Sequence, residues 1–196
     1  MEELRIGCLV MAAGSGSRFG RNKLEAVVDG KTLLRRALEA VPRGEFACVT
    51  VVTQYDGAAA LAEEFGFTVV RNDSPEDGLS RTVRLGTEAM ASCDAIMYQV
   101  ADQPLLERDT VRREVELFRA HPDRIVGLGH SGVRGNPCIF PRRFFPELMA
   151  LTGDTGGSTV IRAHPESLLL CEAAAAELRD VDTVEALAAI RTEKIM

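Results

Sequence analysis

Residues 5–23 read RIGCLVMAAGSGSRFGRNK, an apolar run that passes directly into a glycine-rich loop. A short and nearly continuous run of Ile, Cys, Leu, Val and Met is typical of a strand buried on both faces, here Arg5–Ala13. A loop of glycines and small residues after such a strand lets several backbone N–H groups converge, as phosphate binding requires. The stretch therefore predicts a parallel sheet whose first strand ends at a phosphate site.

The alternation of strand and helix continues along the chain. Apolar runs predict further strands at Ala47–Thr53, Thr68–Val70, Ala95–Val100 and Ile125–Leu128. Between them, apolar residues recur on one helical face: Leu34, Leu38 and Val41, then Leu79, Val83, Gly86 and Met90, then Val111, Val115 and Phe118. We expect an α/β fold, a three-layer, Rossmann-like open sheet, mostly parallel, with helices on both faces. Without a repeat or linker, residues 1–196 are expected to form one domain.

Composition excludes several classes of protein. The 196 residues contain 23 Lys and Arg against 29 Asp and Glu, a net charge of −6, which disfavours nucleic acid as the partner. Hydrophobic residues at 46% and charged residues at 27% exclude disordered and fibrous chains. The apolar stretches are shorter than the roughly 20 residues of a membrane span, and no basic segment opens the chain, so we expect a cytoplasmic protein. Five cysteines without a CxxC pair predict neither a disulfide framework nor a zinc site.

The spacing of the glycines separates this loop from two common phosphate-binding loops. Gly14, Gly16 and Gly20 give GxGxxxG, whereas a dinucleotide-binding fold needs GxGxxG, which disfavours an NAD(P)H-dependent oxidoreductase. Arg21 follows Gly20 where a Walker A loop has Lys. The loop carries its own cations, Arg18, Arg21 and Lys23. These suit a polyphosphate better than a plain glycine-rich turn with solvated basic residues.

Leu9–Lys23 resembles the signature LAAGxSxRMGxxK of the MobA-like nucleotidyltransferases of the molybdenum cofactor type, with Phe19 in place of Met. Ala12-Ala13-Gly14 is similar to the cytidylyltransferase branch, since the guanylyltransferase branch more often has a second glycine there. The resemblance implies the nucleotide-diphospho-sugar transferase type of fold, and CTP as substrate. It implies a nucleotide site made of Ala12, Ala13, Gly14, Ser15, Gly16, Ser17, Arg18 and Lys23.

Acidic residues follow the strand at Ala95–Val100 and recur near the C-terminus. Ligands of open α/β sheets bind beyond the carboxyl ends of the strands, although an Asp there is often only a turn former or helix cap. Asp102-Gln103-Pro104 resembles the family's DQP element, whose Asp holds the Mg²⁺ that bridges nucleotide phosphates. Residues 180–185, DVDTVE, resemble its DxDTPE element, with Val in place of Pro. This implies Asp182 as a second Mg²⁺ ligand, Asp180 being the competing candidate and an N-cap by Asp182 or Thr183 the alternative.

Three further segments resemble family elements. Residues 72–86 are similar to the segment that reads base and ribose, which implies Asn72, Gly78 and Ser80 in nucleotide binding, although Ser80 could instead cap its own helix. Residues 134–137 look like the loop on the pterin side, and residues 153–157 like its GDxGA loop. The resemblance implies that the acceptor is bound by Gln103, Pro104, Gly135, Asn136, Pro137 and Asp154. The Asn136 amide both donates and accepts, as a pterin ring requires, and Asp154 has helix capping as its alternative.

The resemblance implies a Mg²⁺-dependent enzyme that moves CMP from CTP to the terminal phosphate of molybdenum-molybdopterin. The products are molybdopterin cytosine dinucleotide, for a molybdenum hydroxylase, and pyrophosphate. Its catalytic residues are Arg18, Lys23 and Asp102. Such chemistry depends on positioning and charge neutralisation more than on a covalent nucleophile. The alternatives are GTP as nucleotide, a sugar or alcohol phosphate as acceptor, and a carrier that binds the finished cofactor without turnover.

Overall fold

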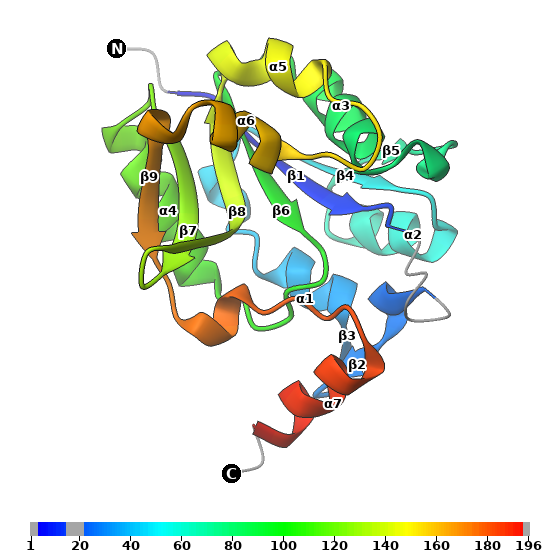
Figure 1. Ribbon diagram of the computed structural model, residues 1–196. Coiled ribbons are helices and arrows are strands. Elements are labelled where there is room, and N and C mark those ends of the chain that lie inside the picture. Colours follow the sequence, from blue (N-terminus) through cyan, green and yellow to red (C-terminus); the bar gives the residue numbers. More distant parts are fainter. Residues whose placement is uncertain (1–3, 15–21, 194–196) are drawn as a thin grey trace.

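The computed structural model describes residues 4–14 and 22–193. A seven-stranded sheet in the order β5-β4-β1-β6-β8-β7-β9 divides the molecule (Figure 1). Its strands are β1 Ile6–Ala12, β4 Cys48–Thr53, β5 Thr68–Arg71, β6 Ala95–Val100, β7 Ile125–His130, β8 Val133–Pro141 and β9 Leu168–Glu172. β8 is antiparallel to both its neighbours, and every other pair is parallel. The predicted, mostly parallel sheet is confirmed.

Helices cover both faces of the sheet. One face packs against α1 Leu33–Glu39, α2 Asp56–Glu64 and α4 Arg108–Ala120, and the other against α3 Leu79–Ala89, α5 Phe145–Met149 and α6 Gly157–Ala163. Residues of β1 alternate between the two cores: Cys8 and Val10 belong to the first and Leu9 to the second, all fully buried. Burial on both faces explains why β1 is apolar at nearly every position.

A smaller layer adjoins the carboxyl end of the sheet. It contains β2 Val27–Val28, β3 Lys31–Thr32 and the last helix, α7 Val184–Glu193, which pack around the buried Val181 and Leu187. The backbone N–H of Val181 donates to the carbonyl oxygen of Asp102 at 2.9 Å. The C-terminal segment is thereby fixed beside the end of β6. Along the described ranges, the helices are too short or too polar to cross a membrane.

The structure corrects several predicted elements. Residues 135–137, predicted as a loop, lie in β8. The prediction was wrong because Gly, Asn and Pro obscure the strand pattern there. β9 and α2 were not predicted. Val41 follows the end of α1, and Leu79 is 38% exposed at the start of α3 rather than in the core. The helical face of Val111, Val115 and Phe118 is confirmed as fully buried in α4.

Glu114 is a buried acid on this same face of α4, and within residues 4–14 and 22–193 neither of its carboxyl oxygens has a hydrogen-bond partner. Burial raises the pKa of Glu114 well above its ordinary value, so the folded protein keeps it neutral. In the unfolded chain Glu114 ionises above about pH 4.5, so its contribution to the free energy of unfolding is fully present below that pH. This contribution is lost as the pH rises, at about 1.4 kcal/mol per pH unit, until the pH reaches the pKa of Glu114 in the folded protein.

When the pH is raised from 5 to 8, the free energy of unfolding of Glu114→Gln is therefore expected to fall by less than that of wild type. Urea unfolding at the two pH values measures the difference. Glu116, exposed on the same helix, supplies the matched control Glu116→Gln, which should follow wild type. Equal losses of stability in wild type and Glu114→Gln would show that Glu114 is not held neutral.

Candidate active site

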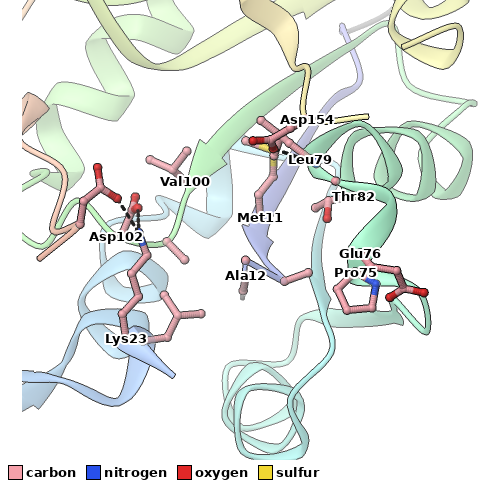
Figure 2. A pocket seen from close by; sticks show the side chains of 16 residues that line it. Met11, Ala12, Lys23, Pro75, Glu76, Leu79, Thr82, Val100, Asp102 and Asp154 are labelled. Atoms are coloured by element: carbon pink, nitrogen blue, oxygen red, sulfur yellow. Dashed lines mark hydrogen bonds and ion pairs between the residues drawn. The ribbon is translucent and has the colours of Figure 1, made fainter. Parts of the chain in front are cut away.

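A cavity of about 880 Å³ opens at the carboxyl ends of β1 and β6, where the sequence predicts the ligand (Figure 2). Its lining combines both strand ends with the start of α3 and parts of the C-terminal half: Met11, Ala12, Ala13, Gly14, Lys23, Leu24, Pro75, Glu76, Gly78, Leu79, Thr82, Val100, Ala101, Asp102, Asp154 and Asp182. Lys23 and Asp102 lie on one side, and Pro75 and Glu76 lie opposite them, with Ala12 between. Among the predicted residues, the cavity brings together Ala12, Ala13, Gly14, Lys23, Gly78, Asp102, Asp154 and Asp182.

Lys23 joins two acidic residues that are far apart in the sequence. Its Nζ lies 2.6 Å from Asp102 Oδ2 and 2.9 Å from Asp182 Oδ1. The Lys23 and Asp102 side chains are 15% and 17% exposed, whereas Asp182 is 55% exposed at the mouth of the cavity. Burial lowers the pKa of Lys23, but Asp102 and then Asp182 more than offset this, and the net pKa lies above its ordinary value. Lys23 is therefore a fixed cation.

Local structure holds these three side chains in place. Lys23 begins a short 3-10 helix, Lys23–Glu25, whose first turn is capped by the Asn22 side chain accepting from the N–H of Leu24 at 3.2 Å. At the other end, Thr183 Oγ1 accepts from the N–H of Ala186 at 3.1 Å. Thr183 thus fills the capping role that was the alternative for Asp182. The Asp182 carboxylate is left to face Lys23.

The acidic residues fit a divalent cation. Asp102 Oδ1 is buried and has no hydrogen-bond partner among the described residues, an arrangement that a bound cation would satisfy. Burial, and after it the nearby Asp102 carboxylate, raise the pKa of Asp180 to about 6. Within residues 4–14 and 22–193, no three His, Cys, Asp or Glu side chains converge on a ready metal site. Two carboxylates completed by phosphate oxygens are the usual arrangement for Mg²⁺.

The far wall of the cavity depends on a close contact between two segments. Gly78 has φ +86°, and a Cβ there would lie 2.5 Å from the backbone of Gly153. The N–H of Ser80 donates to the carbonyl oxygen of Gly153 at 3.1 Å, and Asp154 Oδ1 accepts from the N–H of Leu79 at 3.4 Å. Asp154 therefore binds the start of α3 instead of capping α6, whose N-cap is Gly156. Gly78 is required by both its conformation and its contact.

Asn72 and Ser80 support this wall from behind and do not line the cavity. Asn72 is buried, and its side chain accepts from Arg81 Nε at 3.0 Å and donates to Thr82 Oγ1 at 3.2 Å. Ser80 is fully buried and its hydroxyl accepts from Arg84 at 3.4 Å, so it is no helix cap. Both residues shape the segment that includes Thr82, which does line the cavity.

Most residues predicted for the acceptor lie beside the cavity rather than on its wall. Gln103 is buried and donates from Nε2 to the carbonyl oxygen of Leu178 at 3.2 Å, and the Pro104 carbonyl oxygen accepts from Arg36 at 3.4 Å. Gly135, Asn136 and Pro137 lie on β8 next to the end of β6. Of the predicted acceptor residues, Asp154 alone is in the described lining. Ser15, Gly16, Ser17 and Arg18 lie outside the described residues.

Three residues with no predicted role lie at and just after the end of β4. The side chains of Thr53, Gln54 and Tyr55 donate to the backbone at the end of β1, at distances of 2.9, 2.7 and 2.9 Å. The rule that ligands bind beyond the carboxyl ends of strands could have found them, because they end a predicted strand next to the first. No motif marked them.

Comparison with known proteins assigns the chain to a family. The MobA-like NTP transferase domain matches residues 8–168, which include all but the first two residues of β1 and the whole of β6. The chain belongs to this family. It is a nucleotidyltransferase by family, with the predicted Rossmann-like fold. The match ends before Asp182, so the second carboxylate of the cluster lies outside the matched residues.

Two curated relatives align at similar identity and very different coverage. The chain is 26% identical over 190 residues to the purine catabolism protein PucB of Bacillus subtilis, covering 89% of this chain and 90% of that protein. It is 26% identical over 106 residues to 3-deoxy-manno-octulosonate cytidylyltransferase of Francisella philomiragia. That alignment covers 53% of this chain, and the chain spans only 42% of the length of that relative.

A solved structure shares the fold over nearly the full length. Rv0371c of Mycobacterium tuberculosis superposes with a TM-score of 0.82 at 24% identity, covering 98% of this chain and 100% of that one. A second structure of Rv0371c, with a TM-score of 0.76 at 22% identity, is a complex with manganese and covers 96% and 98% of the two chains.

Proposed function

We propose that this protein transfers CMP from CTP to the terminal phosphate of molybdenum-molybdopterin, releasing pyrophosphate and forming molybdopterin cytosine dinucleotide. The observation that carries nucleotidyl transfer is Lys23 held between Asp102 and Asp182 in the cavity where β1 ends. The choice of CTP is supported by Ala12-Ala13-Gly14 and by a cytidylyltransferase among the relatives. The choice of acceptor rests on the resemblance of residues 134–137 and 153–157 to pterin-side elements.

The basic residues bind the triphosphate, and the acidic residues bind the metal ion. Lys23 and Arg18 neutralise the triphosphate, and the backbone of residues 14–20 binds its β- and γ-phosphates. Asp102 and Asp182 would hold Mg²⁺, which when bound neutralises charge on the phosphate oxygens. A phosphate oxygen of the acceptor forms a bond to the α-phosphorus as the bond to pyrophosphate breaks. No side chain has to become covalently attached.

The remaining assignments belong to the same proposal. Gly78 contacts the nucleotide directly, whereas Asn72 and Ser80 act by holding the wall behind it. Asp154 faces the acceptor, and Gln103, Pro104 and residues 135–137 border its site. Residues 1–196 work as one domain, because Asp182, in the segment before α7, lines the same cavity as residues within 8–168. We place the enzyme in the cytoplasm, supplying a molybdenum hydroxylase.

A product assay tests the proposal. The protein is incubated with Mg²⁺, molybdenum-molybdopterin and each α-labelled nucleoside triphosphate in turn. Label from CTP is expected in the dinucleotide, with one pyrophosphate released per product, and none is expected when the acceptor is omitted. Transfer from GTP would replace the cytidylyl assignment, and transfer to a sugar or alcohol phosphate would replace the acceptor. Tight binding of the finished dinucleotide without pyrophosphate release would support the carrier instead.

A further inference from the structure

Three consecutive side chains at and just after the end of β4 form hydrogen bonds to consecutive carbonyl groups at the end of β1, and we call these three hydrogen bonds the grip. Thr53 Oγ1, Gln54 Nε2 and the Tyr55 hydroxyl donate, in that order, to the carbonyl oxygens of residues 12, 13 and 14. The backbone ladder between the two strands ends at the pair Ala12 and Thr53. Side chains therefore replace the ladder just where the backbone enters the cavity.

This grip fixes the direction of the peptide groups. In a regular strand the backbone is pleated and successive carbonyls point to opposite sides, whereas here three in a row accept from residues that end β4. The N–H of a trans peptide points opposite to its C=O. The N–H groups of Ala13 and Gly14 therefore point away from β4. The strand on the other side of β1 is β6, whose end leads to Asp102.

We propose that Gln54 and Tyr55 are positioning residues for nucleotidyl transfer: by holding the carbonyl groups of Ala13 and Gly14, they fix the backbone so that the N–H groups of Ala13 and Gly14 donate to the nucleotide's phosphate oxygens. This inference rests on the proposed function. Consecutive N–H groups turned to one side form an anion-binding concavity, and donors fixed in advance need no reorganisation when the phosphates bind. Neither side chain has to touch the nucleotide.

The two tyrosines of the chain offer a matched test. Tyr55 is half-buried, and its hydroxyl reaches Gly14 at the solvent-exposed end of the grip. Tyr98 is buried in the core between the sheet and α3, and its hydroxyl bonds to Thr87 at 2.7 Å. Removing the Tyr55 hydroxyl affects the cavity alone, whereas removing the Tyr98 hydroxyl affects the core alone. Thr53 is a poorer choice because it is buried and also accepts from the N–H of Tyr55.

The experiment measures binding of CTP with Mg²⁺, binding of cytidine, and the unfolding temperature for wild type, Tyr55→Phe, Gln54→Leu and Tyr98→Phe. Loss of one hydrogen bond is expected to weaken CTP binding about fivefold in Tyr55→Phe, and Gln54→Leu should act in the same direction. Cytidine has no phosphate, so its binding should not change. Tyr98→Phe should lower the unfolding temperature and leave CTP binding as in wild type.

Two results would overturn the inference in different ways. If wild type binds CTP and Tyr55→Phe binds it equally well, or loses cytidine binding to the same extent, the grip does not position phosphate donors and the proposed function stands. If wild type binds no nucleotide triphosphate, the proposed function fails, and the positioning role fails with it.

Discussion

Replacing Asp102 with Asn is expected to lower the rate of nucleotidyl transfer about a thousandfold while the protein stays folded. A divalent cation on a phosphoryl group contributes several kcal/mol of charge stabilisation, and each 1.36 kcal/mol corresponds to tenfold in rate. Asn keeps the shape of Asp102 but removes the negative charge from Oδ1, which is buried without a partner in the described part of the chain. The backbone carbonyl of Asp102, which holds Val181, is unchanged.

Single-turnover pyrophosphate release measures the loss, and circular dichroism checks the fold. Asp109→Asn is the matched control, because Asp109 is an exposed acid paired with Arg112 on α4. It should retain wild-type turnover. Turnover of Asp102→Asn within a few-fold of wild type would remove Asp102 from the site.

Lys23→Met is expected to have opposite effects on metal binding and on catalysis. In the nucleotide-free protein, Lys23 Nζ sits against the same carboxylates that a divalent cation would use. Removing it should raise the affinity for Mn²⁺ alone roughly tenfold, because about 1.4 kcal/mol of competing attraction is lost. Turnover should fall about a hundredfold, because a fixed cation that stabilises the triphosphate is gone.

Electron paramagnetic resonance of free Mn²⁺ measures the first effect and pyrophosphate release the second. Lys31→Met is the control, since Lys31 pairs with Glu39 on the surface away from the cavity and should change neither quantity. If Lys23→Met binds Mn²⁺ more weakly than wild type, Lys23 does not compete with the metal.

Much of the fold could be predicted because burial on both faces leaves a direct trace in the sequence. β1, β4 and β6 are apolar at nearly every position, and all lie within one residue of their predicted bounds. β8 was missed for an equally physical reason. Its first half carries Arg134, Gly135 and Asn136 at half-buried positions, so neither alternation nor a continuous apolar run marks it.

The site residues that lie in a local sequence motif could be predicted. The residues whose role depends on contacts between distant segments could not. Lys23, Asp102 and Asp182 were each found from a local motif, but their mutual contact is set by the docking of Val181 on the backbone of Asp102. Gln54 has no local signal because its role depends on the strand beside it. Asn72 was predicted to bind nucleotide, yet tertiary packing turns its side chain onto Arg81 and Thr82.

We propose that Lys23, Asp102 and Asp182 form a shared site for a divalent cation and a triphosphate. Wild-type protein is titrated with Mn²⁺ in the presence and in the absence of CTP, and the resonance of the free ion reports binding. Mn²⁺ alone is expected to bind weakly, because Lys23 occupies the carboxylates, and to bind at least tenfold more tightly once CTP supplies phosphate oxygens. If CTP leaves the Mn²⁺ affinity unchanged, the three residues do not form a shared site.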